Sequence, residues 1–283
     1  MKTGTWLGQA ALIGALLLSG SKAFAQNDIH YDDATHVFRL DAGGVTYAFG
    51  INEAQELQPV YWGAAVAGTD RLPAPRRMAE VASFDSTRSV TPSEYSGWGQ
   101  GIYTETALKV TYPDGNRDLV LKYQTHSIRG NELVITLKDV ERALFVELHY
   151  TIDHATGVVG RSAVITNKTA APVTLEEVAA ATWNLPRGTD YNLHYLSGRW
   201  AAETQLQQQA VRPGETVLES KRGSTGHQNN PWFAIERGQH PDEESGDVWA
   251  GALAWSGSWR IAIEQDQLQQ VRITGGYNPF DFG

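Results

Sequence analysis

The chain has 283 residues, no cysteine and a formal net charge of −9. This length supports a large buried core without stabilising disulfides or metal ions, and the lack of cysteine excludes a disulfide scaffold, a cysteine-ligated zinc site and a thiol nucleophile. The acidic excess makes nucleic acid and an anionic membrane surface poor partners. One or two domains are expected from the length, and an all-β sandwich of this size can be a single domain.

The chain begins with a short apolar run that has the flanks of a secretory signal. A lysine at the second position precedes the apolar residues 10–18, and Ala23-Phe24-Ala25 has the small-x-small pattern that signal peptidase accepts. The run is too short to cross a bilayer, which needs about 20 apolar residues. We therefore expect residues 1–25 to be removed before Gln26, and the mature chain to be exported to the periplasm or the extracellular space. A retained membrane anchor is the alternative.

Alternation of period two predicts strands along most of the mature chain. Apolar and polar side chains alternate there, as in strands that bury one face. Turns separate the strands, because Pro113 presets φ and Gly115 and Gly130 tolerate positive φ. Short strands at regular intervals are typical of a sandwich or a barrel. The clearest predicted strands are residues 45–51, 108–112, 119–123, 133–137, 144–152 and 159–165.

Two segments depart from this pattern. Residues 66–93 contain three prolines and four arginines with little alternation, which predicts a long irregular loop. Loops longer than about 12–15 residues are usually functional or disordered. Residues 201–210 favour a helix by composition, but Leu206 is their only large apolar side chain. We therefore expect an exposed, extended strand there, and no segment has convincing helical periodicity.

The motifs that could carry chemistry are weak when each is taken alone. His227 lies in a polar turn, where it either touches a ligand or is a satisfied histidine of that turn. No two carboxylates have a spacing that nominates an acid–base pair, and no nucleophile elbow or dinucleotide-binding motif occurs in a suitable context. The tryptophans could form a sugar-stacking platform, although packing in the core explains most of them. The residues alone indicate an exported all-β domain that could face carbohydrate.

The C-terminal half resembles a known family. Four motifs occur there in order, and together they resemble the N-terminal domain of glycoside hydrolase family 36 α-galactosidases. Residues 61–63 and 93–99 match earlier segments of that family more loosely, and the resemblance covers residues 29–283. The four motifs are Gly198-x-Trp200 with Glu203, Ser220-x-x-Gly223 with Asn230-Pro231, Ser256-Gly257, and a glycine followed by Phe280-Asp281-Phe282.

The resemblance implies a fold and a chemistry for residues 26–283. The implied fold is a large antiparallel β-supersandwich of the galactose mutarotase-like type. The implied parent enzyme removes terminal α-linked galactose with retention, through two carboxylates and a glycosyl-enzyme intermediate, and needs no metal or organic cofactor. In that family a (β/α)₈ barrel follows the supersandwich and holds both catalytic aspartates. We therefore expect this chain to end before the barrel, to contain no catalytic residue and to be inactive alone.

The resemblance also implies partners and sugar contacts. The expected partners are α-galactoside sugars, through the parent enzyme, and either the catalytic barrel or another copy of the chain. Because the domain can edge the active-site pocket, we nominate Trp62 and Asp85 of the irregular loop region as substrate-binding residues. A Trp face suits the apolar face of galactose, and a carboxylate accepts hydrogen bonds from its hydroxyls. The alternative is that Trp62 packs in the sandwich and Asp85 caps a turn.

Two further expectations complete the interpretation. A stand-alone exported module that binds carbohydrate by aromatic stacking is the alternative function, and a purely structural exported domain has no positive feature in its favour. The domain should also expose apolar area where a barrel would pack, because unpartnered apolar patches mark missing interfaces. The candidates for that surface are Trp249, Trp255, Trp259 and Phe280.

Overall fold

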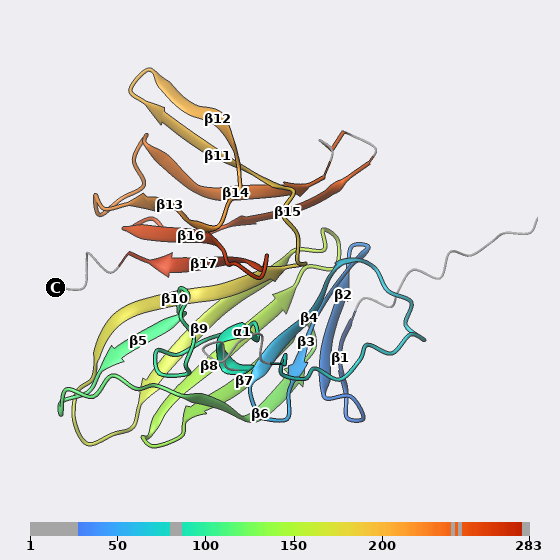
Figure 1. Cartoon of the computed structure of the whole chain (residues 1–283), viewed down its shortest axis with the longest axis vertical. Helices are drawn as coiled ribbons and strands as arrows, with labels where there is room; N and C mark the ends of the chain where they lie inside the picture. Colours follow the sequence, from blue (N-terminus) through green and yellow to red (C-terminus); the bar gives the residue numbers. More distant parts are fainter. Residues whose placement is uncertain (1–27, 80–86, 239–240, 243–244, 279–283) are drawn as a thin grey trace, which may run out of the picture.

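A computed structural model describes residues 28–79, 87–238, 241–242 and 245–278 of the chain. The described residues form an all-β fold of four antiparallel sheets, with one helical turn, α1 (Thr87–Val90) (Figure 1). The all-β class predicted from the alternation is therefore confirmed. No helix in these ranges is long and apolar enough to span a bilayer.

Two four-stranded sheets build the lower half of the molecule in Figure 1. One has the order β1-β2-β3-β4, with β1 (Asp28–Asp32), β2 (Val37–Ala42), β3 (Val45–Ile51) and β4 (Leu57–Ala64). The other has the order β6-β7-β8-β9, with β6 (Leu121–Arg129), β7 (Glu132–Asp139), β8 (Leu144–Ile152) and β9 (Val159–Asn167). Both are meanders of neighbouring strands, and their inward-facing apolar side chains share one core that includes Phe38, Phe49, Leu133 and Tyr150.

A second core lies between two further sheets, which build the upper half of the molecule except for β5 and the first part of β10 (Figure 1). One has the order β12-β11-β14-β15, with β11 (Tyr191–Arg199), β12 (Ala202–Ala210), β14 (Asn229–Arg237) and β15 (Asp247–Ala252). The other has the order β13-β16-β17-β10-β5, with β5 (Leu108–Thr111), β10 (Thr174–Leu185), β13 (Gly214–Ser220), β16 (Trp259–Gln265) and β17 (Val271–Tyr277). The upper core includes Leu193, Phe233, Trp259 and Ile273.

Strand β10 joins the two halves. Its first residues pair with β5, and its later residues pair with β17 across a bulge at Ala179 and Ala181. Val178 and Ala179 belong to the lower core, whereas Leu185 belongs to the upper core. A single twelve-residue strand therefore runs from one core into the other. Tyr95 fixes this junction from the side, because its hydroxyl donates to the carbonyl of Ala179.

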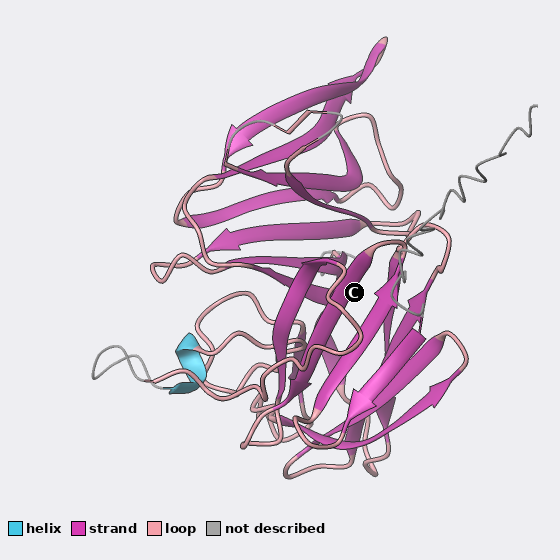
Figure 2. Ribbon diagram, turned by 90° about the vertical axis from the view of Figure 1, so that its right-hand side faces the viewer, coloured by secondary structure: helices cyan, strands magenta, loops and turns pink. Residues whose placement is uncertain are grey.

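Most of the predicted strands have the expected bounds. Residues 45–51 and 144–152 form β3 and β8 as predicted, and the polar segment 202–210 is strand β12. The predicted strand at 119–123 begins later, at Leu121, because the backbone N–H of Leu119 donates to Trp98 instead of joining a sheet. The described part of 66–93 is irregular except for α1, and Figure 2 shows loops gathered around that turn.

The predicted apolar surface near the C-terminus is wrong for two of its four tryptophan and phenylalanine residues. Trp259 is 0% exposed and Trp249 is 7% exposed, because both rings fill the upper core. Trp255 is 44% exposed and packs edge-on against Tyr277, which is 41% exposed. Phe280 lies outside the described residues. The sequence around Trp259 does not reveal which face of its strand, β16, meets the second sheet.

Candidate functional site

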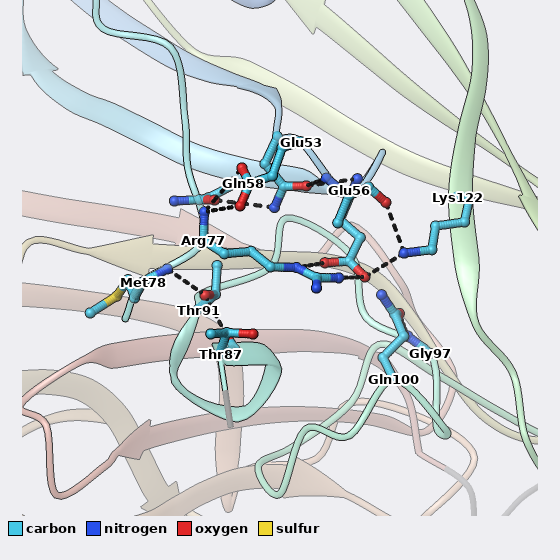
Figure 3. Close-up of polar contacts among 12 residues, drawn as sticks. Glu53, Glu56, Gln58, Arg77, Met78, Thr87, Thr91, Gly97, Gln100 and Lys122 are labelled. Carbon is cyan, nitrogen blue, oxygen red and sulfur yellow. Dashed lines mark hydrogen bonds and ion pairs between the residues drawn. The ribbon is translucent and has the colours of Figure 1, made fainter. Parts of the chain in front are cut away.

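The irregular loop region is held at its base by charged side chains (Figure 3). The guanidinium of Arg77 forms an ion pair with Glu56 at 2.8 Å, and the ammonium of Lys122 contacts the same carboxylate at 2.7 Å. The backbone N–H of Arg77 donates to the carboxylate of Glu53 at 3.1 Å. Arg77, within the irregular region, is therefore fixed to the turn that precedes β4 and lies close to β6.

The loop returns to the body close to where it leaves. The backbone N–H of Met78 donates to the hydroxyl of Thr91 at 2.9 Å, across thirteen residues of sequence. The Thr91 hydroxyl in turn donates to the carbonyl of Thr87 at 2.5 Å, and Gln58 donates to the carbonyl of Arg76. The ends of the loop are thus fixed on the scaffold. Asp85, the predicted carboxylate contact, lies outside the described residues.

A cavity of about 390 Å³ opens beside this base, and the indole of Trp62 is part of its wall. Trp62 is half-buried, contacts both cores and meets the ring of Tyr47 edge-on at 5.7 Å between ring centroids. Trp62 therefore packs against the cores, as one of the two sequence interpretations has it, and it also lies in the wall of a cavity; its contact with sugar stays a prediction. The wall consists of Tyr47, Pro59, Val60, Tyr61, Trp62, Met78, Pro92, Asn184, Leu185, Pro186, Arg187 and Gln270.

Few polar groups converge on this cavity. Asn184 donates to the carbonyl of Ser93 at 3.0 Å, while its side-chain oxygen is buried without a hydrogen-bond partner among the described residues. The guanidinium of Arg187 lies 3.2 Å from the sulfur of Met78. The wall residues include no carboxylate. An aromatic face with an amide and a guanidinium suits a neutral polyol such as a sugar, but it supplies no acid–base pair.

A buried ion pair stands behind the cavity wall. Glu94 and Arg161 are 0% and 2% exposed at their side chains and lie 2.8 Å apart. The hydroxyls of Tyr47 and Tyr150 donate to the same Glu94 oxygen at 2.5 and 3.1 Å. Arg161 also donates to the carbonyl of Thr182 at 2.7 Å. This cluster ties β3, β8, β9 and β10 together behind the aromatic wall.

Burial sets the protonation of the cluster. It raises the pKa of Glu94 above its usual 4.5, although Arg161 and the two tyrosine hydroxyls oppose the shift. It also raises the pKa values of Tyr47 and Tyr150 well above 10, so both phenols stay protonated and donate. Desolvation lowers the pKa of Arg161, but Glu94, Tyr47 and Tyr150 together outweigh it, so the pKa of Arg161 is raised. The cluster therefore holds the hydroxyl of Tyr47, a residue of the cavity wall, in place.

Sequence reasoning missed this cluster, although one signal was present. Arg161 occupies the same phase of alternation as Val159 and Ala163 on β9, and therefore the inward phase. A cation in that phase requires a buried carboxylate. The partner could not be found, because Glu94 lies in an irregular segment whose path no pattern determines.

The remaining candidates do not gather at the cavity. His227 is exposed and lies beside Glu203 and the ring of Trp200, which is 79% exposed. Trp98 is exposed too, but the ammonium of Lys109 covers its ring at 4.5 Å. The tryptophans therefore do not form one platform. Within the described ranges, no cluster of three histidine or acidic residues has the arrangement of a metal site.

Comparison with known proteins finds similarity to α-galactosidases, both in sequence and in structure. The chain is 29% identical to the α-galactosidase Mel36A of Lactobacillus acidophilus, over 90% of this chain and 38% of that protein. The α-galactosidase AgaA of Geobacillus stearothermophilus is also 29% identical, with the same shares covered. The crystal structure of the family 36 α-galactosidase AgaB from Geobacillus stearothermophilus superposes with a TM-score of 0.81 at 27% identity, covering 89% of this chain and 38% of that one.

The chain matches only part of each of these relatives. The chain spans about 38% of the length of the curated relatives it matches. A variant of AgaA has been solved in complex with raffinose, and its fold matches with a TM-score of 0.76 at 28% identity over 87% of this chain. The sequence profile of the glycosyl hydrolase family 36 N-terminal domain matches residues 55–283. This chain therefore belongs to the glycosyl hydrolase family 36 N-terminal domain family.

Proposed function

We propose that this chain is the N-terminal part of an α-galactosidase that breaks down α-galactosides, the class to which the raffinose bound by the AgaA variant belongs. The observation that carries the proposal is the family match over residues 55–283 together with the four-sheet fold. At the finer level we propose that the sheets form a supersandwich, because two cores lie between paired sheets and β10 passes through both. A separate barrel domain would supply the two catalytic carboxylates.

We also propose export. The apolar run at 10–18 and the Ala23-Phe24-Ala25 triplet support a signal peptide, and they lie outside the described residues. Mass spectrometry of the exported protein is expected to show an N-terminus at Gln26. Detection of Met1 in the periplasmic fraction would contradict the proposal.

The chain by itself is expected not to hydrolyse an aryl α-galactoside. Retaining hydrolysis needs two carboxyl groups about 5–5.5 Å apart around the scissile bond, and the described residues in the wall of the cavity beside Trp62 include none. The assay compares highly purified chain with buffer and with an active α-galactosidase. Turnover that survives purification and disappears when a carboxylate of this chain is replaced would contradict the proposal that a separate barrel domain supplies the catalytic carboxylates.

We propose that Trp62 contacts sugar from the wall of the cavity, with Asp85 contributing from the loop. Phenylalanine presents a smaller aromatic face than tryptophan, so Trp62→Phe is expected to lose part of the about 0.5–1.5 kcal/mol that an aromatic contact contributes beyond area burial, which weakens sugar binding by at most roughly tenfold. Phenylalanine retains much of the packing that Trp62 makes with both cores, which keeps the variant folded. Chemical-shift titration with melibiose and raffinose measures the weak binding expected of this chain.

A matched control separates contact from packing. Trp255→Phe changes an exposed tryptophan that is absent from the cavity wall, and it is expected to leave the titration unchanged. Identical titrations for Trp62→Phe and the unaltered chain would show that Trp62 is structural. Strong, saturable binding by the chain alone would instead favour the stand-alone carbohydrate-binding module, for which the cavity beside Trp62 is the supporting observation.

A further inference from the structure

We propose that Met78 is a site of reversible oxidation, at which a peroxide converts the thioether to a methionine sulfoxide whose new oxygen is held by Arg187 and Gln270. The oxidised side chain would fasten the base of the irregular loop region to the body of the molecule. The inference concerns a modification site in the wall of the cavity beside Trp62, and it does not depend on the α-galactosidase assignment.

Two hydrogen-bond donors from separate segments converge on the sulfur of Met78. The guanidinium of Arg187, just after β10, lies 3.2 Å from this sulfur, and the side-chain amide nitrogen of Gln270, just before β17, lies 3.5 Å from it. A thioether is only a weak acceptor, whereas a guanidinium and an amide are good donors. The donors at this place therefore exceed what the reduced sulfur can use, and an oxygen on the sulfur would accept from them more strongly.

The side-chain amide of Gln270 is a fixed donor. The residue is 4% exposed, and its side-chain nitrogen also donates to the carbonyl of Val90 at 2.8 Å. Its side-chain oxygen accepts a hydrogen bond from the guanidinium of Arg272 at 3.3 Å, so both ends of the amide are held. An oxygen added to Met78 would meet a donor that is already oriented, which lowers the entropic cost of the new hydrogen bond.

Peroxide can reach the sulfur, and the product has room. Met78 is half-buried, and its side chain lines the cavity of about 390 Å³ together with Arg187 and Gln270. In Figure 3 the Met78 side chain points away from the ion pair of Arg77 with Glu56. Arg187 is exposed, so its side chain can move aside for the oxidant and return to the new oxygen. Methionine oxidation disrupts packed cores, but here the oxygen is added at a cavity wall that already carries donors.

The reaction is a two-electron oxygen transfer. A lone pair of the sulfur attacks one oxygen of hydrogen peroxide, so that a sulfur–oxygen bond forms and the oxygen–oxygen bond breaks. The proton of the transferred oxygen passes to the departing hydroxide, which leaves as water. The sulfur is oxidised and the peroxide is reduced, and methionine sulfoxide reductases reverse the change. The chain has two methionines and no cysteine, and Met1 falls in the expected signal peptide, so Met78 is the only sulfur expected in the mature chain.

Treatment of the full chain with hydrogen peroxide, followed by peptide mass spectrometry and thermal unfolding, tests the proposal. The peptide that contains Met78 is expected to gain one oxygen atom. The melting temperature is expected to rise by about 2–4 °C, because the new oxygen accepts a stronger hydrogen bond from Arg187 than the sulfur did. The two methionine sulfoxide reductases together are expected to remove the oxygen and to restore the original melting temperature. Met78→Leu, which keeps a similar volume, is expected to melt at the same temperature before and after peroxide.

A matched pair of arginine variants identifies the cause. Arg187→Leu removes the exposed donor, so oxidation is expected to raise the melting temperature of this variant less than that of the unaltered chain. Arg129→Leu removes an exposed arginine at the end of β6, and oxidation is expected to stabilise this control as it does the unaltered chain. An unchanged or lower melting temperature of the oxidised unaltered chain would overturn the proposal, and so would an equal or larger rise in Arg187→Leu. Absence of oxygen on Met78, under conditions that oxidise methionine in a short peptide, would overturn it as well.

Discussion

Replacing Arg161 by methionine is expected to destabilise the fold by about 3–5 kcal/mol, because the change leaves the carboxylate of Glu94 buried without a counter-charge. Glu94 is 0% exposed at its side chain, and one of its oxygens has no hydrogen-bond partner among the described residues. The variant also loses the contact of the guanidinium with the Tyr150 ring, at 5.0 Å from the centroid. Urea unfolding measures the loss.

Two control variants identify the cause. Arg117 pairs with Glu176 on the surface, where it is 43% exposed at its side chain, so Arg117→Met is expected to cost no more than about 1 kcal/mol. The double variant Arg161→Met with Glu94→Gln removes both charges and retains an acceptor for the tyrosine hydroxyls. It is expected to recover part of the lost stability, and a double variant as unstable as Arg161→Met alone would contradict the buried-charge explanation.

The Arg161→Met defect is also expected to depend on pH. Burial raises the folded-state pKa of Glu94 above its usual value, so the folded state binds this proton more tightly than the unfolded state. Stability from that proton is complete below the usual carboxyl pKa and is lost as pH rises through the raised value. Removing Arg161 takes away the principal opposing charge and raises the pKa of Glu94 further. The defect should therefore be largest near neutral pH and shrink in acid.

Gly276→Ala is expected to cost about 3 kcal/mol or more, at or beyond the upper end of the usual range for overpacking. A Cβ on Gly276 would lie 2.2 Å from the carbonyl oxygen of Val178 and 2.5 Å from the Cα of Ala179. Both are backbone atoms of β10 at its bulge, so neither can relieve the clash by a change of rotamer as a side chain could. The substitution should separate β17 from β10 where the two cores join. Thermal unfolding checks this expectation.

The neighbouring glycine provides the control for that prediction. A Cβ on Gly275 would meet Ile261 and Trp183 at 3.6 Å, which is ordinary van der Waals contact. Gly275→Ala is therefore expected to change the melting temperature much less than Gly276→Ala. If the two substitutions lower the melting temperature equally, the loss of backbone freedom in β17 causes the effect of Gly276→Ala. The close approach of Gly276 to β10 would then not be its cause.

The strands were predictable because burial of one face of a strand produces an alternation of apolar and polar residues in the sequence. Apolar residues occupy every second position of Leu144–Ile152 from Leu144 on, and these positions are the buried ones in the structure. The exposed strand β12 was also predictable, since a single leucine cannot form the apolar stripe of a helix. These features depend only on neighbouring residues, which is why the sequence was sufficient for them.

The candidate site was less accessible to sequence reasoning because it depends on contacts between distant segments. Trp62 could be nominated, but its position between two cores arises from sheets that the sequence does not order. The ion pair of Glu94 with Arg161 joins residues 67 positions apart. The sequence around Trp259 likewise gives no sign that a second sheet covers this side chain. Periodicity describes one strand at a time, whereas the site is made where sheets meet.

The passage of β10 through both cores has a consequence for the order of events during synthesis. Its first neighbour, β5, leaves the ribosome before β10 does, but its second neighbour, β17, follows only at Val271–Tyr277. Contacts between distant segments slow folding, because a long intervening chain must first be ordered. The later half of β10 must therefore wait for β17 with its edge unpaired. A chaperone has that interval in which to bind the nascent chain before the upper core closes.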